Sequence, residues 1–229
     1  MNAGIVRFPG SSGDMDCLHV LSNVLGINTR FIWHKDRDTK GLDLIVLPGG
    51  ASFGDYIRCG AIAKLSPIIP KIIEFADKGG LVLGIGNGFQ ILTEIKLLPG
   101  ALIRNKNLKF ICKYVDLRVD NADTRFTTEY KSRQIIRVPI AHNQGCYIAD
   151  DEQWAEIKQY NQIVFRYCGP DGEICDNRNP DGAKDNVAGI INKAGNVLGM
   201  MPRPERCTET IMYSQDGLGL FTSIKNFLG

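Results

Sequence analysis

The chain has 229 residues, and its 27 Lys and Arg against 25 Asp and Glu leave a formal charge of only +2. This length suits one domain with a well-buried core, and the balanced charge excludes a disordered polymer, an acidic tail or a polybasic arm for nucleic acid. No uncharged apolar run reaches the roughly 18 residues of a membrane-spanning helix. The strand-like start Ala3–Val6 has no basic flank, so we expect no secretion signal.

Seven cysteines and three histidines are spread along the chain. The number of cysteines is odd and no pair has C-x-x-C spacing, which is typical of reduced thiols in a cytoplasmic protein and not of a disulfide framework. The histidines lie far apart in the sequence, so we expect no metal site.

The first half of the chain alternates between apolar strands and helical segments. A strand from Gly4 to Phe8 precedes a helix whose apolar residues, from Cys17 to Leu25, share one face. Further strands are expected at 29–33, 42–47 and 81–83, and a helix at 62–76 that is interrupted near Pro67 and Pro70. Continuous apolar strands separated by helices predict a parallel sheet that is covered on both faces.

The second half has a different pattern. Between Leu108 and Val119 apolar and polar residues alternate, which predicts strands with one face toward water. Further strands are expected at 135–139, 163–165, 187–191 and 197–200, a loop at 171–185, and a final amphipathic helix with Leu220, Ile224 and Phe227. Because no linker or repeat divides the chain, we predict a single α/β domain over residues 1–229, with a parallel sheet core and an antiparallel extension.

The segment Leu81–Leu92 contains three alternating glycines between a buried strand and an apolar helix. A dinucleotide-binding loop would need a third glycine where Phe89 stands, and no Lys-Ser/Thr pair follows to make a P-loop. The better interpretation is a nucleophile elbow, a tight turn that exposes its middle residue at the helix N-terminus. That middle residue is Gly86, so the turn has the geometry of an elbow without its chemistry.

Several separated motifs together resemble the glutaminase subunits of phosphoribosylformylglycinamidine synthase, a class I glutamine amidotransferase family of purine (IMP) biosynthesis. They span nearly the whole chain: Phe8–Ser11, Trp33–Asp36, Leu47–Ala63, Asn87–Leu92, Pro139–His142, Val164–Tyr167 and Gly195–Arg206. The resemblance implies a single-domain, flavodoxin-like amidotransferase fold and glutamine as the substrate of the family.

The resemblance also implies where the catalytic residues should lie. In this family a Cys at the elbow attacks the glutamine amide, a His accepts the thiol proton, and a Glu two residues beyond orients the His. Carried over by position, these roles fall on Gly86, Arg203 and Glu205. Gly86 has no side chain and Arg203 stays protonated, so we predict no meaningful glutaminase activity. Rescue by Cys59 or Cys207 is not expected, since neither is on an elbow.

Other positions have two interpretations each. Gly49 and Gly50 follow a strand, and the resemblance implies an oxyanion N–H there, while a turn that requires Gly explains them equally well. Asn87 and Gln90 resemble oxyanion and substrate-contacting positions, with capping or packing as the alternative. Glu205 is expected to form a surface ion pair with Arg203 or Arg206.

Three further groups of residues carry weaker signals. His142 follows a strand and is interpreted as a structural histidine rather than a substitute base. The residues Asp55, Tyr56 and Arg58 are expected in a loop near the site or a partner interface. Trp33 and Trp154 show no ligand pattern and are expected to pack.

Three functions remain open. The first is a glutaminase-deficient subunit that docks on the large synthetase subunit, with a small accessory subunit as a further candidate partner. The second is an active glutaminase, if the residues at the two vacated positions are not native. The third is a binding module that uses the vacated pocket for a small molecule. We expect no cofactor in this chain, with ATP and Mg²⁺ on the synthetase partner.

Overall fold

The computed structural model describes all residues from 1 to 229. Its strands are β1 (Asn2–Arg7), β2 (Asn28–Trp33), β3 (Leu44–Leu47), β4 (Leu81–Ile85), β5 (Ala101–Ile103), β6 (Ile111–Val119), β7 (Ile135–His142), β8 (Cys146–Ile148), β9 (Ile163–Cys168), β10 (Val187–Ile191) and β11 (Val197–Met200). Its α-helices are α1 (Asp14–Leu18, continued by a π-helical segment, His19–Val24), α2 (Ile69–Asp77), α3 (Asn87–Glu94), α4 (Asp151–Gln159) and α5 (Leu218–Leu228).

Nine strands form one sheet in the order β2-β1-β3-β4-β11-β10-β9-β6-β7, and β5 pairs separately with β8. The first five are parallel neighbours, and the remaining four pair antiparallel. The parallel part has the strand order of the flavodoxin-like folds, which place ligands at the carboxyl ends of their strands. The predicted α/β fold, a parallel core with an antiparallel extension, is confirmed.

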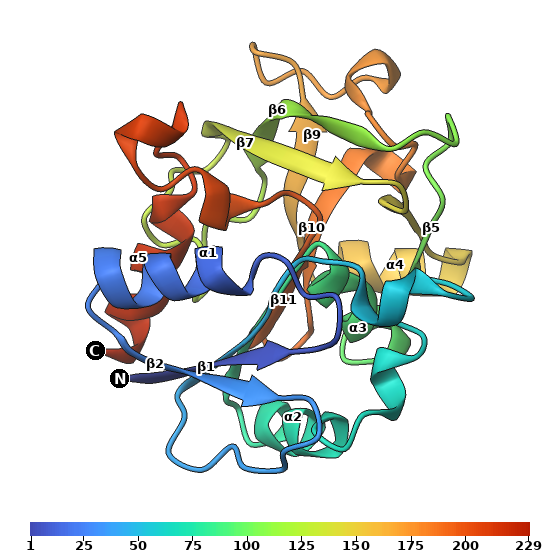
Figure 1. Ribbon diagram of the computed structural model, residues 1–229. Helices are drawn as coiled ribbons and strands as arrows, with labels where there is room; N and C mark the ends of the chain where they lie inside the picture. Colours follow the sequence, from blue (N-terminus) through green and yellow to red (C-terminus); the bar gives the residue numbers. More distant parts are fainter.

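Two apolar cores lie on opposite faces of this sheet because neighbouring residues of a strand point to opposite sides. Ile5 and Leu83 contribute to the core that α1 and α5 cover, whereas Val6 and Val82 contribute to the core under α2, α3 and α4. Figure 1 shows α1 and α5 side by side on one face of the sheet. The unbroken apolar runs in the first half follow from this double coverage.

The expected helix at 62–76 is shorter in the structure. A single 3₁₀ turn, Ala63–Leu65, is followed by an extended residue, and α2 begins only at Ile69 with Pro70 in its first turn. A proline fits the first turn of a helix because its missing N–H has no partner there, but it interrupts a longer helix. The prediction of one interrupted helix is therefore corrected to a turn and a helix.

Helix α4 has no counterpart among the elements expected from the sequence. Its N-cap is Asp150, whose side chain accepts a hydrogen bond from the Gln153 N–H, but only Ile157 among its nine residues is buried. A helix with so little apolar content has almost no periodic signal.

Two absences concern the kinds of site that remain possible. None of the helices has both the length and the apolar content needed to cross a bilayer. No group of three or more His, Cys, Asp or Glu side chains is placed to hold a metal ion.

Candidate active site

The elbow lies where β4 ends and α3 begins. Gly86 has φ 53° and ψ −108°, a combination that residues with a side chain seldom adopt. A Cβ placed on Gly86 would lie 3.6 Å from Arg203 Cδ and 3.7 Å from Gly49 Cα, which are ordinary contacts. The turn therefore keeps the strained backbone of a nucleophile elbow, and a Cβ at its tip would fit without displacing a neighbour.

The other two glycines of the elbow bring α3 against the sheet. A Cβ on Gly88 would lie only 1.9 Å from the Leu47 carbonyl oxygen, and a Cβ on Gly84 would lie 2.8 Å from the backbone of Gly88. Helix α3 can pack this closely on β3 and β4 only because both positions lack a side chain. The elbow is thus set by backbone packing, independently of any nucleophile.

Gly49 and Gly50 form the turn at the carboxyl end of β3. The Gly49 carbonyl accepts hydrogen bonds from the N–H groups of Ser12 and Gly13, at 2.9 and 3.0 Å, which ties this turn to the loop after β1. Gly50 has φ 153°, and a Cβ there would lie 2.4 Å from the Gly10 carbonyl oxygen. The structure therefore requires glycine at Gly50 for steric reasons alone, whatever its N–H does.

Arg203 lies beside the elbow, directly after β11. Its side chain is only 5% exposed, and its Nε donates a hydrogen bond to Oε1 of Glu205, which is fully buried. The guanidinium occupies space that side chains on Gly13 and Gly49 would need, since a Cβ on either would come within 2.5 Å of it. Burial alone lowers the pKa of Arg203, but the Glu205 carboxylate outweighs burial and raises it above its ordinary value. Arg203 is therefore a permanent cation.

This pair corrects one expectation. Glu205 does pair with Arg203, but in the interior and not at the surface, because the turn after β11 folds inward between the β1 and β3 loops. Arg206 pairs instead with Asp16, at 2.9 Å. Nη2 of Arg203 and Oε2 of Glu205 are buried without hydrogen-bond partners. The contact between the two side chains is thus a single charged hydrogen bond.

The elbow opens into a cavity of about 250 Å³. Its lining includes Gly50, Gly86, Asn87, Gln90 and Arg203, so five of the seven predicted site residues share one pocket. The rest of the lining comes from the loop after β3, from Phe110 before β6, from Met201 after β11 and from the end of β7: Ala51, Gly54, Asp55, Cys59, Phe110, Ala141, His142, Asn143 and Met201. Gly49 and Glu205 lie behind the wall, against Arg203.

Asn87 and Gln90 are already engaged by neighbouring residues. The Asn87 Oδ1 accepts from the Ser52 N–H at 3.2 Å, and its Nδ2 donates to Gln90 Oε1 at 2.9 Å. Gln90 Nε2 donates in turn to the Gln144 carbonyl at 2.7 Å. The backbone N–H of Asn87 belongs to the first turn of α3, where helices have no internal acceptor, so it is the group available to an oxyanion.

No cysteine near the site has the character of a nucleophile. Cys59 lines the pocket, and burial raises the pKa of its thiol, with a further increase from Asp55. Burial also raises the pKa of Cys17 far above its ordinary value and that of Cys207 to about 12. Since the thiolate is the attacking species, these thiols are inert near neutral pH.

His142 lines the pocket and belongs to a buried polar cluster. Its Nδ1 lies 3.2 Å from Asn105 Oδ1, and its Nε2 lies 3.5 Å from Asp181 Oδ2. The Asn105 amide donates to the Lys109 and His142 carbonyls, so its oxygen faces the imidazole and Nδ1 carries the hydrogen. Burial lowers the pKa of His142 to about 4 and raises that of Asp181 to about 7. No sequence pattern indicates the contact with Asp181, because the two residues meet only in the fold.

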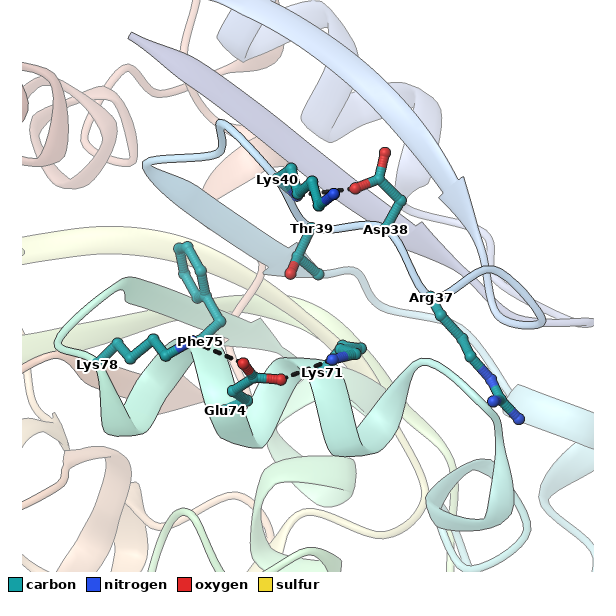
Figure 2. A pocket seen from close by; sticks show the side chains of 8 residues that line it. All are labelled: Arg37, Asp38, Thr39, Lys40, Lys71, Glu74, Phe75 and Lys78. Atoms are coloured by element: carbon teal, nitrogen blue, oxygen red, sulfur yellow. Dashed lines mark hydrogen bonds and ion pairs between the residues drawn. The ribbon is translucent and has the colours of Figure 1, made fainter.

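A larger groove, about 640 Å³, lies elsewhere, between the loop after β2 and helix α2. Figure 2 shows its lining, in which Glu74 is held between Lys71 and Lys78. Hydrogen bonds from these two lysines lower the pKa of Glu74 to about 2. The groove contains neither a nucleophile nor a buried polar group, so the smaller cavity at the elbow is the candidate site.

Comparisons with known proteins agree with this geometry. Residues 1–222 match the family described as the CobB/CobQ-like glutamine amidotransferase domain. The chain is 52% identical to the phosphoribosylformylglycinamidine synthase subunit PurQ of Moorella thermoacetica, covering 98% of this chain and 95% of that protein. It is 51% identical to PurQ of Synechocystis, covering 96% and 98%. A chain in the structure of PurLQS from Thermotoga maritima superimposes with a TM-score of 0.88 at 40% identity, covering 100% and 99%.

Proposed function

The chain belongs to the CobB/CobQ-like glutamine amidotransferase family, and we propose that it is the glutamine amidotransferase subunit of phosphoribosylformylglycinamidine synthase without glutaminase activity of its own. Its relatives at about half identity, over nearly their whole length, carry the name of that subunit. One observation carries the second part of the proposal: the elbow is intact, but the residue at its tip is Gly86.

The missing side chain removes the first chemical step. Glutamine hydrolysis in this family starts with a bond between a cysteine sulfur and the amide carbon, and Gly86 offers no atom for it. The proton acceptor is absent as well, because Arg203 is a buried cation paired with Glu205. In the related triad of a serine protease, loss of the nucleophile or the base alone lowers turnover by roughly 10⁶-fold.

His142 does not replace the missing base. It lines the pocket, but Asn105 and Asp181 face its two ring nitrogens, and its low pKa makes it a poor proton acceptor near pH 7. With the three nearby thiols inert, the pocket retains an N–H donor for an oxyanion at Asn87 and no group to create the oxyanion.

The role left to this chain is structural. We infer that it docks on the large synthetase subunit, which binds ATP and Mg²⁺, and that the assembly converts formylglycinamide ribonucleotide with ammonia from solution or another source. The solved relative named for PurLQS supports a partner of the PurL type and a further one of the PurS type. We expect the assembly in the cytoplasm, in keeping with the seven free cysteines.

The binding-module alternative is disfavoured by the same pocket. An anionic ligand would need an uncompensated cation, but the charge of Arg203 is neutralised by Glu205 and its guanidinium packs against Gly13 and Gly49. The one carboxyl group in the lining, that of Asp55, repels anions when it is ionised.

A synthase assay with the purified cognate large subunit tests the proposal. We expect turnover with ammonium, none with glutamine above the large subunit alone, and a stable complex between the two proteins. Glutamate release from glutamine by the unaltered chain would overturn the proposal, as would the absence of a complex. Ammonium-dependent turnover also shows that the synthetase itself is competent, so a negative result with glutamine is informative.

Restoring both vacated positions is the matched control. In the double variant Gly86→Cys/Arg203→His, the new Cβ at position 86 meets no atom of Gly49 or Met201 closer than 3.7 Å, and Glu205 is in place to orient the new imidazole. We expect glutamate release to appear in the double variant, with each single variant at least 100-fold slower, since nucleophile and base act as a unit. Equal activity of one single variant would show that the other position does not limit the reaction.

A further inference from the structure

The groove between the loop after β2 and helix α2, about 640 Å³ in volume, has no part in the proposed function. We call it the basic groove. Its volume lies within the range of small-molecule sites. Figure 2 shows its eight lining residues, which come from two elements on opposite sides: Arg37, Asp38, Thr39, Lys40, Lys71, Glu74, Phe75 and Lys78.

The basic groove holds an excess of positive charge. Four of its lining residues are Lys or Arg and two are Asp or Glu, which leaves a net charge of +2. The formal charge of the whole chain is also +2, so the charges of all the other residues cancel. The excess charge of this protein is therefore gathered in one concave surface, and such a surface attracts ligands of the opposite sign.

On the loop wall, two cations have no partner within the protein. The side chains of Arg37 and Lys40 are exposed, and neither forms an ion pair with a carboxylate of the chain. Asp38, which lies between them in the sequence, is engaged elsewhere: its Oδ1 accepts a hydrogen bond from the Lys40 backbone N–H at 3.0 Å, and its Oδ2 lies 3.5 Å from Arg30 Nη1. Both charges of the loop wall can therefore meet a ligand without breaking an internal pair.

On the helix wall, two lysines converge on one carboxylate. Lys71 Nζ lies 2.7 Å from Glu74 Oε2, and Lys78 Nζ lies 2.6 Å from Glu74 Oε1, as the dashed lines in Figure 2 mark. The three side chains together keep a net charge of +1. Ion pairs between exposed residues three or four positions apart on a helix are weak, so an external anion can share both lysines. Glu74 acts as an internal competitor for that anion.

We propose that the basic groove binds the phosphate chain of a small molecule, either a nucleoside triphosphate or an inorganic polyphosphate. A chain of phosphates fits better than a single one, because the cations lie on two opposite walls of a groove that is large enough for several phosphate groups. Lysine and arginine are the side chains that bind phosphate through charged hydrogen bonds. Phe75 is the one apolar residue in the lining, so the ligand is recognised by its charge and not by a base.

Two variants change the groove in opposite directions. Arg37→Ala/Lys40→Ala removes the two unpaired cations of the loop wall, whereas Glu74→Gln removes the internal competitor and leaves both lysines of the helix wall in place. Lys109→Ala/Lys131→Ala is the matched control, because it removes two exposed cations that lie outside the groove and form no ion pair. All the substituted side chains are exposed, so the variants should keep the unfolding temperature of the unaltered chain.

Calorimetry with the full chain measures the binding of tripolyphosphate, ATP, inorganic phosphate and adenosine, at low salt and without Mg²⁺ so that the phosphate charges are neither screened nor neutralised. We expect tripolyphosphate and ATP to bind, inorganic phosphate to bind more weakly than either, and adenosine not to bind. The Kd for tripolyphosphate should weaken by about tenfold or more in Arg37→Ala/Lys40→Ala, tighten by about threefold or more in Glu74→Gln, and stay within about twofold in the control.

The relative affinity of ATP and tripolyphosphate identifies which of the two sources supplies the phosphate chain. An unaltered chain that binds neither compound would overturn the inference, as would a control that weakens binding as much as the groove variant. Adenosine that binds as tightly as ATP would overturn recognition by charge. The test uses no group at the elbow, so a negative result leaves the proposed function standing.

Discussion

Arg203 carries a charge that the fold has taken out of water, and Glu205 is the residue that compensates it. The pair is 5% and 0% exposed, and its one hydrogen bond joins Nε to Oε1. A buried ion pair adds little net stability, but removal of one partner leaves an uncompensated charge in the interior. Loss of one partner therefore destabilises the fold by more than the intact pair stabilises it.

Arg203→Ala is accordingly expected to lower the free energy of unfolding by about 3–5 kcal/mol. Arg206→Ala is the control, since its pair with Asp16 is more than one-third exposed on both sides and should contribute less than about 1 kcal/mol. Urea unfolding of both variants measures the difference. Similar losses in the two variants would show that Glu205 is not stranded by the first substitution.

Asp181 and His142 titrate in opposite senses. The folded pKa of Asp181, about 7, lies above its ordinary 3.8, so its stabilising contribution is complete at low pH and is lost as the pH rises through 7. The folded pKa of His142, about 4, lies below its ordinary 6.5, so its contribution is present above pH 6.5 and is lost as the pH falls through 4. Between pH 4 and 6.5 the two effects largely offset each other in the intact protein.

The variant Asp181→Asn should remove the contribution of Asp181 to the pH dependence of stability and leave that of His142. The variant keeps an acceptor for the Ala183 N–H and removes the titrating carboxyl group. We expect it to match the parent near pH 4 and to become more stable than the parent by roughly 2–4 kcal/mol at pH 8. Unfolding curves at several pH values test the trend. A difference that does not change with pH would contradict the assignment.

At the scale of elements, the elbow is a packing feature, and a different physical reason requires glycine at each of its positions. At Gly86 the backbone angles are the obstacle, while at Gly88 the obstacle is the Leu47 carbonyl oxygen, which would lie 1.9 Å from an added Cβ. Gly86→Ala should therefore cost about 1–3 kcal/mol through strain. Gly88→Ala should cost at least about 3 kcal/mol, because α3 must move away from β3.

Thermal unfolding of the two variants distinguishes these reasons. Gly195→Ala serves as the control, because Gly195 also has a positive φ, 71°, but nothing lies within 4 Å of its missing side chain. It should cost about 1–2 kcal/mol. Equal losses at Gly86 and Gly88 would mean that α3 adjusts its position easily.

In the hairpin β6–β7, the alternation of apolar and polar residues predicts the strand but not the direction of its side chains. The alternation between Leu108 and Val119 correctly predicts a strand with one face toward water. It does not tell which face is outward, because the apolar residues up to Tyr114 occupy even positions except for Ile111, and those from Val115 occupy odd positions. The choice follows from the packing of Val115, Leu117 and Val119 on the core that α5 covers.

At the scale of the whole molecule, the two halves of the chain interleave. The strand β11, near the C-terminus, lies between β4 of the first half and β10 of the second. Neither half can complete its part of the sheet alone, so we predict one cooperative unit over residues 1–229.

The two tryptophans report on this prediction independently. Trp33 ends β2 at one edge of the sheet, and Trp154 lies in α4 on the second half of the chain. The single-tryptophan variants Trp33→Phe and Trp154→Phe should show fluorescence transitions at the same urea concentration as the loss of helical circular dichroism. Separate midpoints for the two probes would indicate two folding units.

The sequence by itself determined the order of strands and helices in the first half, the elbow, and the absence of a nucleophile and a base at the family's positions, because each depends on residue types over short stretches. Only the tertiary structure decided that Arg203 and Glu205 are buried, that Gly13 makes room for the guanidinium 190 residues away, and that His142 meets Asp181. These contacts join segments far apart in the chain. Burial and charge compensation are properties of the packed molecule, and no local pattern encodes them.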